Sequence, residues 1–199
     1  KNGFYGRGTC DMKSFIAVSL DLVSKINTRN LKKPIHLIFS YDEEIGCVGI
    51  QNIVPFIKKL RPKPTYCIVG EPTEMKVVNE HKGKKNFLVQ FNGVEAHSSL
   101  IHNGVNTINF CSEFIEFLKN LQKQISISSK NSKYNPPYST INIGLIKGGV
   151  ALNIIPKYCE IEFEIRDTPE INSERILKQI KNFLKSLEIK MKKINNKCF

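Results

Sequence analysis

Residues 156–166 read P-K-Y-C-E-I-E-F-E-I-R, and this stretch decides the fold of the second half of the chain. From residue 159 onward, apolar and charged side chains take turns: Cys159, Ile161, Phe163 and Ile165 alternate with Glu160, Glu162, Glu164 and Arg166. Successive side chains of a strand point to opposite faces of its sheet. The alternation therefore predicts a strand with one face against a core and the other in water.

The segments around this strand complete a ferredoxin-like pattern. Apolar positions at a spacing of two predict strands, and apolar positions at helical spacing predict helices. The predicted strands are 84–91, 139–147, 156–166 and 189–194, and the predicted helices are about 106–124 and 173–187. Their order along the chain is βαββαβ, the ferredoxin-like unit. We expect residues 81–195 to form a separate domain, a four-stranded antiparallel sheet with two helices on one face.

The first 80 residues show a different pattern, in which predicted helices alternate with buried strands. The near-continuous apolar runs 34–41 and 66–70 predict strands that are buried on both faces, as in a parallel sheet. Helices are predicted at 12–25 and about 48–60. The alternation of helices and strands predicts an α/β fold, with part of a parallel-sheet domain in residues 1–80.

Acidic side chains follow the apolar runs of this first part. They are Asp11 in G-R-G-T-C-D-M-K, the pair Glu43-Glu44 in Y-D-E-E-I-G, and Glu71 in V-G-E-P-T. Carboxylates hold hard divalent cations, and one carboxylate can bridge two of them. Ligands of open α/β sheets bind beyond the carboxyl ends of the strands, where these residues are expected. The order of the three sites predicts a two-metal hydrolase with residues 1–80 as part of its catalytic domain.

Each acidic site also has a plainer explanation when taken alone. Asp11 can cap the helix that follows it, and the other two sites can be solvated turns. Glu43 and Glu44 are neighbours, and neighbouring side chains of extended backbone point in opposite directions. One of them can therefore ligate a metal while the other acts as a general base.

None of the four histidines is identified as a metal ligand by spacing. His36 lies inside a predicted buried strand, and His81 and His102 are typical of surface loops. His97, in G-V-E-A-H-S-S, follows a strand of the second domain and cannot be assigned from its spacing to the acidic residues. The sequence thus offers carboxylate ligands without an evident imidazole partner.

Charge and cysteine usage bear on partners and compartment. The formal net charge is +12, and the chain has 25 Lys, 5 Arg and 19 Asn. Because the basic residues are dispersed and Arg, the preferred reader of phosphates and bases, is scarce, we expect neither a nucleic-acid nor a membrane partner. The six Cys residues contain no C-x-x-C pair, which indicates reduced thiols in a cytoplasmic protein, with Cys10 as the candidate reactive thiol.

Seven blocks of the sequence together resemble the acetylornithine deacetylase family. That family is part of the zinc metallopeptidases and amidohydrolases that include succinyl-diaminopimelate desuccinylase, aminoacylase and carboxypeptidase G. The blocks cover nearly the whole chain: G-R-G-T-C-D-M-K, Y-D-E-E-I-G-C-V-G, G-E-P-T, N-E-H-K-G-K, G-V-E-A-H-S-S, G-V-N-T-I and G-G-V-A-L-N-I-I-P.

The resemblance implies roles for the acidic residues. Asp11 would bridge two divalent metal ions, Zn or Co. Glu43 would be the general base, Glu44 a ligand of one metal and Glu71 a ligand of the other.

The resemblance also implies that the second domain is a lid through which two subunits dimerise. His97 would reach from the lid of one subunit into the active site of the partner and stabilise the oxyanion. Asn153 and Arg166 match lid positions that contact substrate, with Arg166 as a clamp for a carboxylate.

The chain departs from the family pattern at two metal ligands. The family's histidine in an H-x-D segment before the G-R-G loop, and its last metal histidine after the lid, have no counterpart here. We therefore expect this chain to be a fragment that is inactive alone. The resemblance implies removal of the acetyl group from N2-acetyl-L-ornithine for arginine biosynthesis. A desuccinylase or another N-acyl amino-acid hydrolase is the alternative within the family, and a non-catalytic dimerisation module is the alternative outside it.

Overall fold

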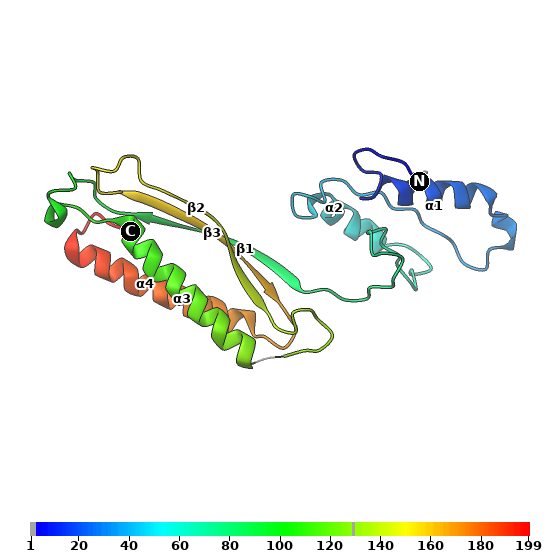
Figure 1. Ribbon diagram of the computed structural model, residues 1–199. Helices are drawn as coiled ribbons and strands as arrows, with labels where there is room; N and C mark the ends of the chain where they lie inside the picture. The colour runs from blue at the N-terminus through cyan, green and yellow to red at the C-terminus, as the bar shows by residue number, and fades with distance from the viewer. Residues whose placement is uncertain (1–2, 129) are drawn as a thin grey trace. The chain divides into compact units, whose positions relative to one another are not determined.

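A computed structural model of the protein describes residues 3–128 and 130–199. The chain forms two compact units, Lys1–Val78 and Asn79–Phe199 (Figure 1). None of the helices in the described part of the chain is long and apolar enough to cross a membrane. The assignment of residues 1–80 to catalysis and of 81–195 to a lid stays a prediction.

The regular structure of the first unit consists of helices. They are α1 (Lys13–Lys25), the 3-10 helix η1 (Thr28–Asn30) and α2 (Val48–Ile57). The helices predicted at 12–25 and 48–60 are thereby confirmed, although the second ends earlier than expected. At the start of α2, a Cβ on Gly49 would lie 2.2 Å from the carbonyl oxygen of Tyr41. Only glycine permits this approach, which closes the turn that carries Glu43 and Glu44.

The strands predicted at 34–41 and 66–70 are wrong, since neither segment forms a strand. Their apolar side chains are exposed, Phe39 at 50% and Ile68 at 83%. A buried parallel strand needs hydrogen-bonded neighbours at its sides and helices over both faces. The two runs do not pair with each other, so the described residues contain no parallel sheet. The α/β class of the chain is confirmed, but its sheet is antiparallel and lies in the second unit.

Three antiparallel strands form the sheet of the second unit, in the order β1-β3-β2. The strands are β1 (Gly83–Asn92), β2 (Thr140–Gly148) and β3 (Tyr158–Asp167). The central strand β3 is the alternating stretch of the sequence, and all three positions agree with the predicted strands. β1 pairs with β3 along its whole length, whereas the pairing of β2 shifts register between Ile143 and Leu145.

Two long helices, α3 (Thr107–Ser128) and α4 (Ser173–Ile194), lie on the same face of this sheet (Figure 1). The apolar side of β3 packs against them, with Phe163 3% exposed. The Phe163 ring meets that of Phe114 on α3 edge to face, at a centroid separation of 5.8 Å. Such aromatic contacts add to the stabilisation from apolar burial. The opposite face of β3, with its three glutamates, faces away from the helices.

The fourth strand predicted at 189–194 is wrong, because α4 continues through Ile194. Leu187 and Met191 are each 1% exposed, so the apolar residues of this segment keep helical spacing and fill the core. A strand-like contact to β1 occurs later in the chain. The backbone of Phe199 donates a hydrogen bond to Asn92 at 3.0 Å and accepts one from it at 2.8 Å. The observed order is therefore βαββα, with one residue pair on the outer edge of β1.

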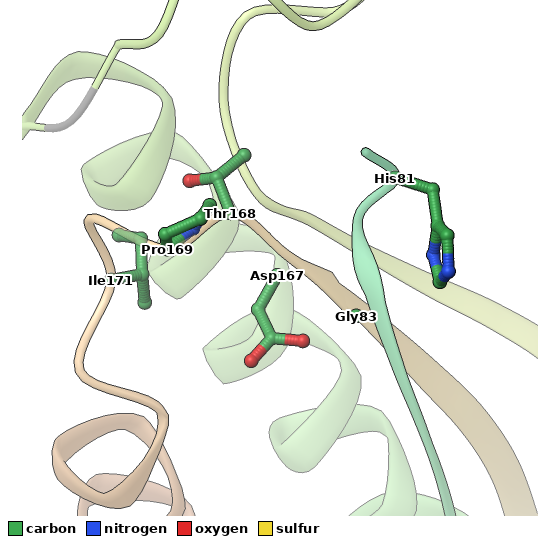
Figure 2. A pocket seen from close by; sticks show the side chains of 6 residues that line it. All are labelled: His81, Gly83, Asp167, Thr168, Pro169 and Ile171. Atoms are coloured by element: carbon green, nitrogen blue, oxygen red, sulfur yellow. The ribbon is translucent and has the colours of Figure 1, made fainter. Parts of the chain in front are cut away.

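Asp167, at the end of β3, joins the sheet to the start of α4. Its carboxylate accepts hydrogen bonds from Lys85 Nζ at 2.5 Å and from the Ser173 hydroxyl. It also lines a pocket of about 310 Å³ beside Gly83 and Thr168 (Figure 2). Burial raises the pKa of the Asp167 carboxyl, but the hydrogen bonds and the charge of Lys85 outweigh burial and hold the pKa below its usual range.

Asp167→Asn is expected to lower the free energy of unfolding by about 1–3 kcal/mol, the usual contribution of hydrogen bonds to a charged group. Because the pKa of Asp167 is lowered in the folded state, its ionised carboxylate stabilises the fold at pH values above the unfolded pKa of ~3.9. This stabilisation is lost as the pH falls through the folded pKa. In urea unfolding between about pH 7 and pH 3, the free energy of unfolding should fall less on acidification in the variant than in the wild type. Glu162→Gln is the matched control, since Glu162 lies on the same strand without an ion pair among the described residues. Equal stability of Asp167→Asn and wild type at pH 7 would contradict this account.

Candidate active site

The acidic residues of the first unit lie at the ends of its helices and loops. Asp11 lies two residues before α1, next to the N-cap residue Met12, and Glu43 and Glu44 lie in the turn before α2. The turn is closed by the backbone N–H of Cys47, which donates to the Glu43 carbonyl oxygen at 2.9 Å. Glu71 follows the 66–70 segment in an irregular loop.

The electrostatics of Glu71 show that these acids are neighbours. Partial burial, followed by the negative charges of Asp11, Glu43 and Glu44, raises the pKa of the Glu71 carboxyl. Each neighbouring carboxylate opposes ionisation of Glu71, because like charges at short range repel. The charges of Asp11, Glu43 and Glu44, which belong to separate sequence motifs, therefore act on Glu71 in the fold.

Cys47 belongs to the same neighbourhood, and sequence reasoning missed it. Its Sγ donates to Glu43 Oε1 at 3.7 Å. Burial, the charge of Glu43, this hydrogen bond and the charge of Glu71 raise the pKa of the thiol, which stays protonated at neutral pH. The signal available in the sequence was its position four residues after Glu43 in a turn that enters a helix. Cys10, singled out from the sequence, is an exposed free thiol.

A closed metal site is not formed by these residues. Within the described ranges 3–128 and 130–199, no three His, Cys, Asp or Glu side chains lie close enough to hold an ion. The predicted ligands Asp11, Glu44 and Glu71 are of the right chemical type, since carboxylate oxygens suit hard divalent cations. Their roles as ligands, and that of Glu43 as a base, stay predictions.

His97 and Asn153 are brought together at one end of the second unit. The loop after β1 and the loop between β2 and β3 pair through a bridge between His97 and Ile154. The Ser98 N–H donates to the Asn153 carbonyl oxygen at 2.9 Å. The exposed His97 ring is oriented by Ser99, whose Oγ lies 2.8 Å from Nδ1.

The same two loops border an apolar groove of about 600 Å³. Ile101, Val150 and Leu152 line it and are strongly exposed, at 75%, 86% and 102%. His97 and Asn153 therefore lie at an exposed, largely aliphatic tip of the domain.

Arg166 is not part of this tip. It lies on the helix-free face near the other end of β3, where it pairs in register with Lys84 of β1. It lies eight positions along β3 from Tyr158, which is roughly 26 Å at ~3.3 Å per residue. Within one chain, His97 and Asn153 thus lie at one end of the sheet and Arg166 at the other.

One of the two edges of the sheet is formed by β2, whose second side pairs with no strand in the described part of the chain. Leu145 is 54% exposed and Ile146 52% exposed, although Ile146 is in register with the fully buried Ile161. The one charged residue of the strand, Lys147, is engaged by Glu160 at 3.2 Å. An apolar edge strand of this kind is a template for pairing with another strand.

The chain is similar to known proteins over its whole length. Residues 79–192 match the peptidase dimerisation domain of the M20 family. The chain is 36% identical over 198 residues to acetylornithine deacetylase of Buchnera aphidicola subsp. Acyrthosiphon pisum (strain Tuc7), covering 100% of this chain and 50% of that protein. It is 33% identical over 187 residues to acetylornithine deacetylase of Aliivibrio fischeri (strain ATCC 700601 / ES114), covering 94% of this chain and 49% of that protein. Among solved structures, aminobenzoyl-glutamate utilization protein from Klebsiella pneumoniae aligns with 56% of this chain and 26% of its own, at 18% identity and a TM-score of 0.43.

An antiparallel sheet with both helices on one face places the second unit in the class of two-layer α/β domains. The chain belongs to the M20 peptidase family, through the dimerisation domain that residues 79–192 match. It spans about half the length of the curated relatives it matches. The family resemblance expected from the sequence is confirmed.

Proposed function

We propose that this chain is part of a metal-dependent amide hydrolase that removes the acetyl group from N2-acetyl-L-ornithine. The products would be L-ornithine and acetate, for arginine biosynthesis in the cytoplasm. The observation that carries the proposal is that partial burial, followed by the negative charges of Asp11, Glu43 and Glu44, raises the pKa of the Glu71 carboxyl. Gathered carboxylates are costly unless a cation lies among them. The substrate is suggested by the two relatives, both named acetylornithine deacetylase.

Asp11, Glu44 and Glu71 would hold two divalent ions, Zn or Co. The donor type fits such ions, because carboxylate oxygens are among the ligands that these divalent metals take in hydrolases. When bound, the ions would supply positive charge that activates water and stabilises the negative charge of the transition state. The carboxylate repulsion at Glu71 is the cost that this positive charge relieves.

Glu43 would move the proton. As a general base it accepts a proton from the attacking water, and the protonated carboxyl then donates it to the leaving amine. Cys47 supports this role, since its thiol donates to Glu43 Oε1 at 3.7 Å and leaves Oε2 available.

We propose that the active form is a homodimer in which residues of both lids meet one substrate. His97 and Asn153 would come from one subunit and Arg166 from the other, since one domain holds them at opposite ends of β3. His97 would donate a hydrogen bond to the developing oxyanion. Arg166 would bind a substrate carboxylate through its planar guanidinium. The free β2 edge, with Leu145 and Ile146, is the surface that we propose for dimer contact.

Steady-state rates of the full-length protein on a panel of N-acylated amino acids test the proposed reaction. We expect kcat/KM for N2-acetyl-L-ornithine to exceed that for N-succinyl-L,L-diaminopimelate by at least about 10-fold, because a pocket shaped for acetyl and ammonium groups leaves a second carboxylate unpaired. Loss of activity on chelation and its return with Zn or Co would support the metal assignment. Preference for the succinylated substrate would replace this reaction with desuccinylation. A protein that turns over no member of the panel would favour a non-catalytic dimerisation module.

A further inference from the structure

We propose that Glu164 is a positioning residue that holds the guanidinium of Arg166 in the orientation required to bind a substrate carboxylate. The inference rests on the proposed role of Arg166 as the carboxylate clamp.

Glu164 and Arg166 are neighbours on the helix-free face of β3. Arg166 Nε donates a hydrogen bond to Glu164 Oε1 at 3.1 Å. The second oxygen of the same carboxylate, Oε2, lies 4.0 Å from Lys84 Nζ. Since Lys84 is the register partner of Arg166 on β1, the carboxylate is bracketed by two cations of adjacent strands.

The contact at Nε decides which edge of the guanidinium remains for a ligand. Arginine carries five N–H donors in one rigid plane. With Nε engaged by Glu164, the two terminal nitrogens of Arg166 have no hydrogen-bond partner in the described part of the chain. These nitrogens can take a carboxylate end-on through two parallel hydrogen bonds.

The exposed fractions of the two side chains indicate which one positions the other. The Glu164 side chain is 28% exposed, whereas that of Arg166 is 44% exposed. The acid is thus the more enclosed member and the guanidinium the more accessible one. Exposed ion pairs contribute little to folding stability, so the pair is better explained by orientation of the guanidinium than by stabilisation of the sheet.

The charges of the cluster also match a single carboxylate. Lys84 and Arg166 contribute two positive charges and Glu164 one negative charge, which leaves one positive charge for a ligand. Glu164 therefore orients the clamp and opposes a second anionic group at the same place.

The test compares variants of the full-length protein in steady-state kinetics with N2-acetyl-L-ornithine. Glu164→Ala is expected to raise KM about 5–20-fold with kcat within about 2-fold of wild type, because binding of the carboxylate is weakened in ground and transition states alike. Glu164→Gln keeps an oxygen that accepts from Nε, so it should restore KM to within about 3-fold of wild type. Glu162→Ala, on the same strand and face, is the matched control and should leave KM unchanged.

The double variant separates positioning from an independent role. Because Glu164 acts through Arg166, adding Glu164→Ala to Arg166→Ala should raise KM no further than Arg166→Ala alone. Independent, multiplying effects would overturn the inference. The inference would also be overturned if Arg166→Ala raised KM while Glu164→Ala kept the wild-type KM. That result would leave the proposed role of Arg166 as the clamp intact. An unchanged KM in Arg166→Ala would overturn the clamp and this inference together. Failure of Glu164→Ala to fold would assign Glu164 to the structure of the sheet and overturn it as well.

Discussion

Replacing Glu43 with Gln is expected to lower turnover of the full-length protein by about 10²–10⁴-fold, the usual contribution of a general base. The substitution keeps the size of the side chain and its hydrogen bond from Cys47 but removes the group that accepts the proton. Metal content, measured by mass spectrometry of the purified protein, should stay near that of the wild type. The loss should appear in kcat more than in KM, because the proton moves only in the reacting complex.

Glu44→Gln is the matched control, since it makes the same chemical change one residue later in the same turn. It should lower metal content, because the proposed role of Glu44 is to ligate a metal. If Glu43→Gln lost metal while Glu44→Gln kept it, the two roles would be reversed. If neither variant lost activity, the acidic group of the first unit would not be catalytic.

Mixing two inactive variants is expected to restore activity. In a dimer whose active sites each take Glu43 from one subunit and His97 from the other, Glu43→Gln and His97→Ala homodimers have two defective sites each. Random exchange of subunits makes half of the dimers mixed, and each mixed dimer of two-fold symmetry has one site with both wild-type residues. The mixture should therefore recover roughly a quarter of wild-type activity. Activity that stays at the level of the separate variants would show that His97 does not act across the dimer.

Subunit exchange should depend on the β2 edge. Leu145→Lys places a charge on the proposed contact strand, and we expect it to shift the protein toward monomer in analytical ultracentrifugation and to prevent the recovery of activity. Leu88→Lys is a matched control, because Leu88 is 55% exposed, Leu145 is 54% exposed, and both are register partners of Glu162. Equal dimerisation of the two variants would place the contact elsewhere on the domain.

Elements with an amphipathic repeat were predictable from the sequence. Both β3 and α3 bury one side against the same core. Apolar residues therefore recur at the period of the strand in β3 and at the period of the helix in α3. The segments at 34–41 and 66–70 carry no such period. A continuous apolar run shows only that a segment is suited to burial, and pairing depends on neighbours far along the chain. In the segment 189–194 the helical period of α4 continued further than the predicted boundary.

The candidate residues follow the same division. The sequence supplies the type and order of Asp11, Glu43, Glu44 and Glu71, and it was their combination, not any single motif, that predicted cation chemistry. The contact of Cys47 with Glu43 and the pairing of Glu164 with Arg166 could not, because side-chain direction depends on the backbone around each residue.

The sequence by itself determined the antiparallel α/β domain, the family and the chemical types available for a site. The tertiary structure alone decided which of those residues meet. His97 lies beside Asn153 because two loops far apart in the sequence are joined by the strand pairing that brings Asn92 opposite Tyr158. The same register carries Arg166 to the far end of β3. Register arises from hydrogen bonds between residues far apart in the sequence, and a shift of one residue would turn every side chain to the other face. A local sequence pattern therefore does not predict which ends of the strands come together.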